Sequence, residues 1–324
     1  MLSPDFAKLT LDTYAAGQPA FVSQPILWAS GIILVHHVAA DAAFGAIQLA
    51  IGLGLLIRPT ARVALGASIV WALGIWYLGE GLGGIASGHA AIISGAPGSA
   101  LLYAVVGAAV WPAGSEGSKT RRWRLGRWLG AASSDLPPRR WVVGAWALLW
   151  LGGMVLLSLP SQASADALAG SPLALAPSAP AWLASWDYSV AAWILSSGNG
   201  LVTGLTVLEG LIGVVALIGG WPRRTAIALG IALALADWVI GQGLGQLYGG
   251  QATDPNAGPM IVLLGVVVLA CGSGARSKWW LYTHSVYNHH SQPATAGIPN
   301  SAQPLVSPSA AKSRLMRLVV RRST

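Results

Sequence analysis

The chain alternates long apolar runs with short polar connections. A bilayer core is crossed by about 20 predominantly apolar helical residues, and seven runs approach that length. They cover residues 40–57, 63–81, 96–112, 141–159, 200–220, 226–244 and 259–272. Tryptophan or proline stands near the ends of most of these runs, as is typical of helices that end at a membrane interface. The pattern predicts an all-α, polytopic membrane protein with seven transmembrane helices.

An eighth apolar stretch, residues 21–39, is interrupted at its end by His36, His37 and Asp41. Polar and ionisable side chains are costly inside a membrane. We therefore predict a helix that lies along the outer surface, with an eighth transmembrane helix as the alternative.

The sequence contains an internal similarity between its two halves. The segment Trp76-Tyr-Leu-Gly-Glu80-Gly-Leu-Gly83 matches Trp238-Val-Ile-Gly-Gln242-Gly-Leu-Gly245, and the same offset pairs Pro97 with Pro259. An even number of crossings separates the two halves, which predicts a parallel repeat about an axis along the membrane normal. Residues 40–112 and 200–272 are then two parallel three-helix repeats, joined by 141–159 as a linker span. A partner of that linker span is expected before residue 1.

These boundaries divide the chain into seven parts. They are an outer-face N-terminal segment with an interfacial helix (1–39), the first three-span repeat (40–112), a basic cytoplasmic loop (113–140), the linker span (141–159), an extracytoplasmic loop with an interfacial helix (160–199), the second three-span repeat (200–272) and a basic, partly disordered cytoplasmic tail (273–324).

Composition supports the membrane interpretation. Of the 324 residues, 54% are hydrophobic and 9% are charged, whereas a soluble domain has about 25% charged residues. This excludes a soluble enzyme and a nucleic-acid-binding domain, and a single cysteine, Cys271, excludes a disulfide scaffold. All Lys and Arg residues except Lys8 lie in alternate connections or in the tail. By the positive-inside rule those connections and the C-terminus are cytoplasmic and the N-terminus is outside.

Five ionisable residues cluster at the predicted outer end of the first repeat: His36, His37, Asp41, Glu80 and His89. Histidine and carboxylate groups together can bind a divalent metal or relay protons. The structural alternative is that Glu80 caps a helix end and the histidines lie at the interface. In the second repeat Gln242 and Gln251 replace Glu80 and His89. Only the first half therefore keeps the ionisable groups.

Two carboxylates lie within predicted spans of the second repeat. At 1.5 Å per residue, Glu209 is roughly 13 Å below the outer end and Asp237 roughly 16 Å from the inner end. The two side chains are predicted to meet near mid-membrane, where a carboxylate pair that shares a proton suits a proton or ion path. A Glu that is hydrogen-bonded between helices is the alternative.

The basic tail contains a second membrane-directed feature. Residues 310–322 combine five Lys or Arg with five large apolar side chains, a pattern typical of a short helix on anionic lipid. The Gly-rich segment from Gly79 to Gly84 follows an apolar helix and lacks the lysine of a phosphate-binding loop. We expect it to be a turn at the outer face.

Two sets of residues carry a family resemblance. Residues 208–219, followed by Arg223-Arg-Thr, resemble the second helix of DoxX-type membrane proteins, and residues 48–58 are a weaker copy. The fuller pattern is similar to a family of uncharacterised actinobacterial multi-spanning membrane proteins. Its marks are Gly17-Gln-Pro-Ala20, Arg58-Pro-Thr, Trp76 to Gly83, Gly95-Ala-Pro-Gly98 and Thr253-Asp-Pro-Asn256. The resemblance implies a bacterial plasma-membrane protein, and its DoxX part implies quinone-linked redox chemistry.

These observations favour a non-catalytic role. The predicted function is an accessory or binding subunit of a bacterial envelope or respiratory system, with a quinone or a divalent metal as the possible cofactor. Its predicted partners are the lipid bilayer, anionic lipid at the tail and other membrane subunits, with no nucleic acid. The alternative function is a small proton- or ion-coupled transporter or channel that uses Glu209 and Asp237.

Overall fold

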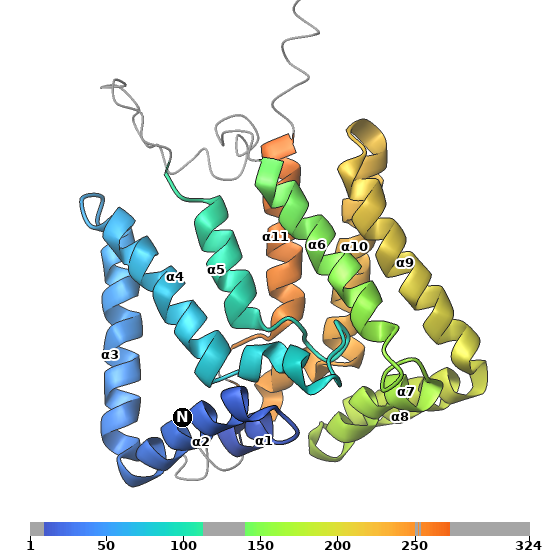
Figure 1. Ribbon diagram of the computed structural model, residues 1–324, viewed down its shortest axis with the longest axis horizontal. Coiled ribbons are helices and arrows are strands. Elements are labelled where there is room, and N and C mark those ends of the chain that lie inside the picture. The colour runs from blue at the N-terminus through green and yellow to red at the C-terminus, as the bar shows by residue number, and fades with distance from the viewer. Residues whose placement is uncertain (1–9, 113–139, 250–251, 253, 273–324) are drawn as a thin grey trace, which may run out of the picture. The chain divides into compact units, whose positions relative to one another are not determined.

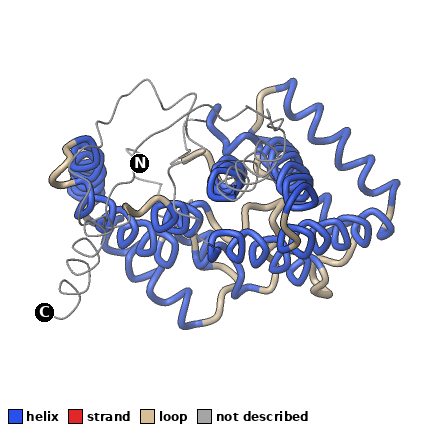
Figure 2. Tube along the Cα trace, turned by 90° about the horizontal axis from the view of Figure 1, so that it is seen from above, coloured by secondary structure: helices blue, strands red, loops and turns tan. Residues whose placement is uncertain are grey.

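The structure is a computed structural model, and it describes residues 10–112, 140–249, 252 and 254–272. Within these ranges the chain is helical and contains no β-strand (Figure 2). The helices are α1 (Asp12–Ala15), α2 (Ala20–Val35), α3 (His37–Leu56), α4 (Ala61–Leu78), η2 (Gly81–Ser87), α5 (Ser99–Ala109), α6 (Arg140–Leu157), α7 (Ala165–Leu175), η4 (Ala176–Ser178), α8 (Ala181–Ser197), α9 (Asn199–Leu217), α10 (Gly220–Ile240), η5 (Gly243–Gly249) and α11 (Ala257–Gly272). The all-α prediction is confirmed for the described residues.

Each of the seven predicted runs overlaps mainly one helix, and Figure 1 shows these helices running roughly along one direction, with α5 and α11 covering only part of the length of the others. These helices are, in chain order, α3, α4, α5, α6, α9, α10 and α11. Four of them, α3, α4, α6 and α9, are long and apolar enough to cross a membrane, and α10 with η5 makes a fifth if that bent pair is one span. The apolar helices α5 and α11 are shorter. The chain is thus a candidate multi-pass membrane protein with four or five such spans.

The helices outside this set lie across one end of it. Figure 1 shows α1 and α2 beneath α3 and α4, and α7 and α8 beneath α6 and α9. A break at His36 separates α2 from α3, and the hydroxyl of Tyr77 in α4 donates a hydrogen bond to the Phe21 carbonyl of α2 at 2.7 Å. The predicted interfacial helix in 160–199 is in fact two helices, α7 and α8, with buried side chains between them.

The main hydrophobic core lies among α5, α6, α9, α10 and α11. Trp146 and Trp150 of α6 are fully buried there and their rings are 5.8 Å apart. Gly230 of α10 lies directly against both rings, and Gly213 of α9 lies close to the Ala147 carbonyl. Small residues at such contacts let helix backbones approach closely, which is the common way that helices associate in membranes. In contrast, α3 has no buried residue.

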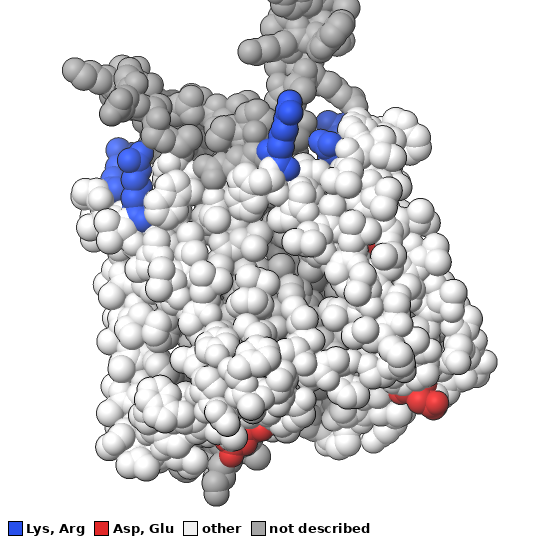
Figure 3. Space-filling model, in the orientation of Figure 1, with Lys and Arg blue, Asp and Glu red and all other residues white. Residues whose placement is uncertain are grey.

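Charge is segregated along the helices. In Figure 3 the visible Lys and Arg atoms gather at one end and most of the visible Asp and Glu atoms lie near the other. The described basic residues are Arg58, Arg62, Arg140, Arg223 and Arg224. The basic residues of 113–139 and the predicted lipid-binding helix at 310–322 lie outside the described residues.

The chain has two similar breaks, one in η2 after α4 and one in η5 after α10, and they share one backbone pattern. After α4, Leu82, Gly83 and Gly84 all have left-handed φ values of 57°, 63° and 75°. After α10, Leu244, Gly245 and Gln246 have φ values of 54°, 68° and 54°. A left-handed conformation costs a residue other than glycine roughly 1–2 kcal/mol. A costly local conformation that occurs twice is therefore held by its surroundings.

In both breaks, a tryptophan side chain is hydrogen-bonded to a backbone carbonyl just before the next helix. The indole of Trp76 donates a hydrogen bond to the Pro97 carbonyl at 2.7 Å, and that of Trp238 donates one to the Pro255 carbonyl at 2.8 Å. Pro255, not Pro259, therefore takes the position of Pro97. The constant offset of the sequence comparison ends within the loop because the second loop is shorter.

Candidate functional site

Glu80 lies at the junction between α4 and α5. One carboxylate oxygen, Oε1, accepts hydrogen bonds from the Ser99 hydroxyl at 2.5 Å and from the Ala100 backbone N–H at 3.1 Å. These donors belong to the first turn of α5, whose free N–H groups and dipole favour a negative charge. Glu80 therefore caps α5, as the structural alternative from the sequence proposed.

Gln242 occupies the corresponding place in the second break. Its Oε1 accepts a hydrogen bond from the Gly258 N–H of α11 at 2.9 Å, and its Nε2 donates one to the Ile92 carbonyl at 3.2 Å. Gln242 is 2% exposed, and both ends of its amide are satisfied. Corresponding positions in the two breaks thus carry different groups, a neutral amide at Gln242 and an ionisable carboxyl at Glu80.

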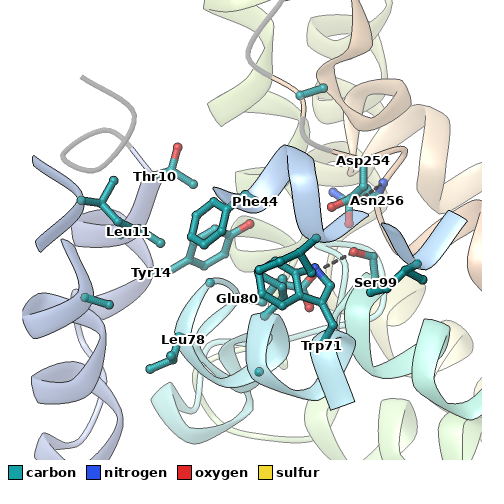
Figure 4. A pocket seen from close by; sticks show the side chains of 18 of the residues that line it. Thr10, Leu11, Tyr14, Phe44, Trp71, Leu78, Glu80, Ser99, Asp254 and Asn256 are labelled. Carbon is teal, nitrogen blue, oxygen red and sulfur yellow. Dashed lines mark hydrogen bonds between the residues drawn. The ribbon is translucent and has the colours of Figure 1, made fainter. Parts of the chain in front are cut away.

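Glu80 lines a cavity of about 1050 Å³ (Figure 4). Its other polar lining residues come from α1, the residues just before it, the start of α5 and the segments beside the breaks, and they are Thr10, Thr13, Tyr14, Ser99, Gln246, Asp254 and Asn256. The lining residues from α2, α3 and α4 are all apolar or aromatic: Ala29, Ile33, Phe44, Ile47, Ala50, Ile51, Ala67, Val70, Trp71, Gly74, Ile75 and Leu78. The cavity therefore has a polar end and an apolar body.

The apolar body follows two of the candidate spanning helices. The lining residues of α3 run from Phe44 to Ile51 and those of α4 from Ala67 to Leu78. At 1.5 Å per residue the α4 wall is about 16 Å long, roughly half of a 30 Å hydrocarbon core. Phe44 and Trp71 are in edge-to-face contact on these walls, with ring centroids 5.5 Å apart and an interplanar angle of 66°.

The carboxyl groups at the polar end influence one another. Glu80 follows α4, outside the apolar helix itself. Burial raises its pKa, the hydrogen bonds from Ser99 and Ala100 lower it, the negative charge of Asp254 raises it, and the net pKa is about 7. The charges of Glu80 and Asp254 also act on Tyr14. Near neutral pH this end of the cavity therefore changes its charge.

The other four outer-face candidates do not line the cavity. His36 is exposed at the break between α2 and α3, and His89 is exposed after η2. His37 begins α3, and Asp41 is half-buried with one oxygen, Oδ2, that has no hydrogen-bond partner within the described part of the chain. Among the residues that the structure describes, no three His, Cys, Asp or Glu side chains form a group that would hold a metal ion.

Glu209 and Asp237 are both buried, at 5% and 7% exposure. They belong to the adjacent helices α9 and α10 and are close enough for the charge of Asp237 to act on Glu209. Glu209 Oε2 has no hydrogen-bond partner among the described residues, and Gly153 of α6 lies beside it. The pair lies outside the cavity lining. Its role as a proton or ion path stays a prediction.

Sequence reasoning missed most of the cavity. Tyr14, Phe44 and Trp71 were not singled out as site residues. Asp254 and Asn256 were visible solely as part of the Thr253-Asp-Pro-Asn256 motif. The Asn256 N–H donates to the Asp254 carboxylate at 2.6 Å. This turn brings the polar residues of the second half to a cavity that otherwise belongs to the first half.

The helices and this cavity define the class of the protein, a helical candidate membrane protein with a partly apolar cavity at one end of its spans. Comparisons with protein-family models, with curated proteins and with solved structures find no match.

Proposed function

We propose that the chain is an integral protein of a bacterial plasma membrane that binds an amphiphilic, lipid-like molecule in its cavity, without catalysing a reaction. The observation that carries this proposal is the separation of the lining, with polar groups confined to one end and apolar side chains along α3 and α4. Ligand cavities typically combine an apolar lining with a few placed polar groups. The quinone that the DoxX resemblance implies belongs to this class of molecule. The alternative function is the ion-coupled transporter that uses Glu209 and Asp237.

We further propose that all seven helices cross the membrane as two parallel repeats, α3–α4–α5 and α9–α10–α11, with α6 as the linker. The shared left-handed breaks and the two tryptophan hydrogen bonds support this arrangement. In it, α5 and α11 are the two shortest crossings.

The proposed orientation places the Lys and Arg end in the cytoplasm and the cavity at the outer face. We expect a cysteine at His89 to react with a membrane-impermeant maleimide on intact cells, and a cysteine at Pro59 to react only after the cells are opened. Both positions are exposed and lie at opposite ends of α4. The native Cys271 is buried and is replaced by Ala in both variants. Labelling of Pro59→Cys alone on intact cells would reverse the orientation.

The cavity itself is tested at Gly74, which lines it and beside which an added Cβ meets no atom within 4 Å. Gly74→Leu places a side chain in the space between α3 and α4 without a backbone clash. We expect it to weaken the binding of tritiated decanol to the detergent-purified full chain at least tenfold.

The matched control is Gly45→Leu. Gly45 lies in α3, also has no atom within 4 Å of an added Cβ, and does not line the cavity. This variant is expected to bind decanol as the unchanged protein does. Equal decanol binding by both variants and the unchanged protein contradicts the proposed function.

A further inference from the structure

Helix α3 has a face that no other described helix covers. None of its 20 residues is buried, and Figure 1 shows it at the edge of the described helices, with α4 beside it. Gly45, Gln48, Gly52 and Leu55 follow one another along this face at intervals of three and four positions, and all four are exposed. An added Cβ at Gly45 or Gly52 meets no atom within 4 Å. We call these four residues the α3 seam.

The spacing of the α3 seam is that of a helix-packing face. Alternating intervals of three and four positions form the narrow stripe through which two parallel helices pack. Glycine on such a stripe lets two helix backbones approach closely in a membrane. The cavity is lined by other residues of α3, namely Phe44, Ile47, Ala50 and Ile51. The seam and the cavity are therefore separate surfaces of this helix.

Gln48 is the polar member of the seam. It lies near the middle of a helix that is long and apolar enough to cross a membrane, and it is exposed. Lipid tails offer an amide no hydrogen-bond partner, so an exposed glutamine in the hydrocarbon region costs free energy. A glutamine amide both donates and accepts hydrogen bonds. It can therefore be satisfied by an identical amide on a second copy of the chain.

The second repeat shows that the corresponding face packs against a helix in this fold. Glu209 and Gly213 of α9 correspond to Gln48 and Gly52 at one constant offset. Both are buried, and α6 packs along α9 there, with Gly153 of α6 beside the Glu209 carboxylate. The position that carries an acid against α6 in the second repeat thus carries a self-complementary amide on the uncovered face of the first.

A helix that packs as α6 does on α9 would not fit the α3 seam. In α9, Gly210 lies directly against Met154 of α6, and at the same offset α3 has Leu49. The leucine side chain takes the space that the methionine would need. Two α3 helices fit instead, because the positive-inside rule gives every copy the same orientation. The copies then meet about an axis along the membrane normal, with α3 parallel to α3 and identical residues facing each other.

We propose that the chain forms a symmetric dimer in the membrane through the α3 seam, with the two Gln48 side chains hydrogen-bonded to each other across the axis. The contact uses the same surface on both copies, so the assembly closes at two. This inference goes beyond the ligand of the cavity. It rests on one part of the proposed function, the crossing of the membrane by α3.

The experiment is disulfide cross-linking of single-cysteine variants of the full chain in native membranes, with Cys271 replaced by Ala. We expect copper phenanthroline to join two copies at Gln48→Cys and Gly52→Cys at least fivefold faster than at Ala46→Cys and Leu53→Cys. The two control positions are exposed residues of α3 outside the seam. Equal rates at all four positions, or no cross-link between copies at any of them, would contradict the proposal.

The strength of the dimer is measured by energy transfer between copies labelled at His89→Cys, diluted in vesicles of phosphatidylethanolamine and phosphatidylglycerol. Gly52→Leu blocks the close approach of the two backbones and is expected to weaken dimerisation about tenfold or more. Gln48→Leu removes the amide and is expected to weaken it about fivefold, with Gln48→Asn restoring part of the loss. Ala46→Leu adds bulk to α3 outside the seam and is expected to change dimerisation less than twofold.

The outcomes separate this inference from the proposed function. Gly45→Leu is expected to weaken dimerisation and still to leave decanol binding unchanged. If Gln48→Cys cross-links to a different protein and not to a second copy, another helix covers the seam and the dimer is wrong. If the seam does not cross-link although His89→Cys and Pro59→Cys label from opposite sides, the dimer alone is wrong. If those two positions label from the same side, the membrane arrangement and the dimer both fail.

Discussion

Gly83→Ala is expected to prevent the chain from folding stably. Gly83 has a φ of 63°, and an added Cβ would overlap the carbonyl group of Pro97. Backbone atoms on both sides of this contact cannot move aside as a flexible side chain would. The same Pro97 carbonyl accepts the Trp76 hydrogen bond at 2.7 Å, so a shift that relieves the overlap also breaks that bond. We expect a loss of more than about 4 kcal/mol, in the range of the most disruptive single substitutions.

The measurement is the fraction of detergent-extracted protein that elutes as one monodisperse species, together with its melting temperature. Gly84→Ala is the matched control. Gly84 has a φ of 75°, but its added Cβ would only be in ordinary contact, 3.7 Å from the Ala90 side chain. It should lose about 1–2 kcal/mol, the left-handed penalty alone. Equal damage from the two substitutions would mean that the close approach to Pro97 is not the cause.

The places of the seven apolar helices α3, α4, α5, α6, α9, α10 and α11 were predictable from the sequence because apolar runs are local properties, whereas α1 and the division of 160–199 into α7 and α8 were not predicted. The breaks were not. The sequence predicted a turn in the Gly-rich segment after α4, but it did not predict that Leu82, Leu244 and Gln246 are left-handed, since none of these residue types favours that conformation. Contacts from distant residues hold them there. The sequence comparison paired Pro97 with Pro259, whereas in the structure Pro255 accepts the hydrogen bond that corresponds to the one at Pro97. That pairing depends on a contact across the loop, so the sequence alone did not reveal it.

The candidate site divides in a similar way. Glu80 was predictable because a carboxyl near a span is rare enough to be noticed. Tyr14 and Asp254 were not, because a tyrosine before the first long helix and an aspartate in a turn are common. They become site residues only when α1 and the segment before α11 come to the same cavity as Glu80. His36, His37 and His89 stood out in the sequence by type alone, and the fold does not bring them to the cavity.

Gln242→Glu is expected to be the most damaging substitution that preserves side-chain shape. Gln242 is buried, and its Nε2 donates to the Ile92 carbonyl at 3.2 Å. An ionised glutamate at this position loses that donor and places a carboxylate oxygen against the carbonyl oxygen. Leaving a buried charge without a partner costs about 3–5 kcal/mol. A protonated glutamic acid can still donate to Ile92. The defect is therefore expected to be smaller at pH 5.5 than at pH 8.

The reciprocal substitution, Glu80→Gln, is expected to raise the stability of the folded protein, whereas Gln242→Glu lowers it. Because burial raises the pKa of Glu80 to about 7, the folded state binds more protons than the unfolded state between about pH 4.5 and 7. Its stability therefore falls as the pH rises through that interval. A glutamine at this position does not ionise, so the stability no longer falls as the pH rises. We expect Glu80→Gln to stabilise the protein by about 1–2 kcal/mol at pH 8, since the side chain is only partly buried, and to change little at pH 4.5.

The melting temperatures of the unchanged protein and of both variants, taken at pH 4.5, 5.5 and 8 in one detergent, test the pair together. Destabilisation by Gln242→Glu and stabilisation by Glu80→Gln at pH 8 would establish that the two breaks are equivalent in structure and differ in charge. Destabilisation by both at pH 8 would mean that the hydrogen bonds from Ser99 and Ala100 favour the Glu80 carboxylate by more than burial disfavours it.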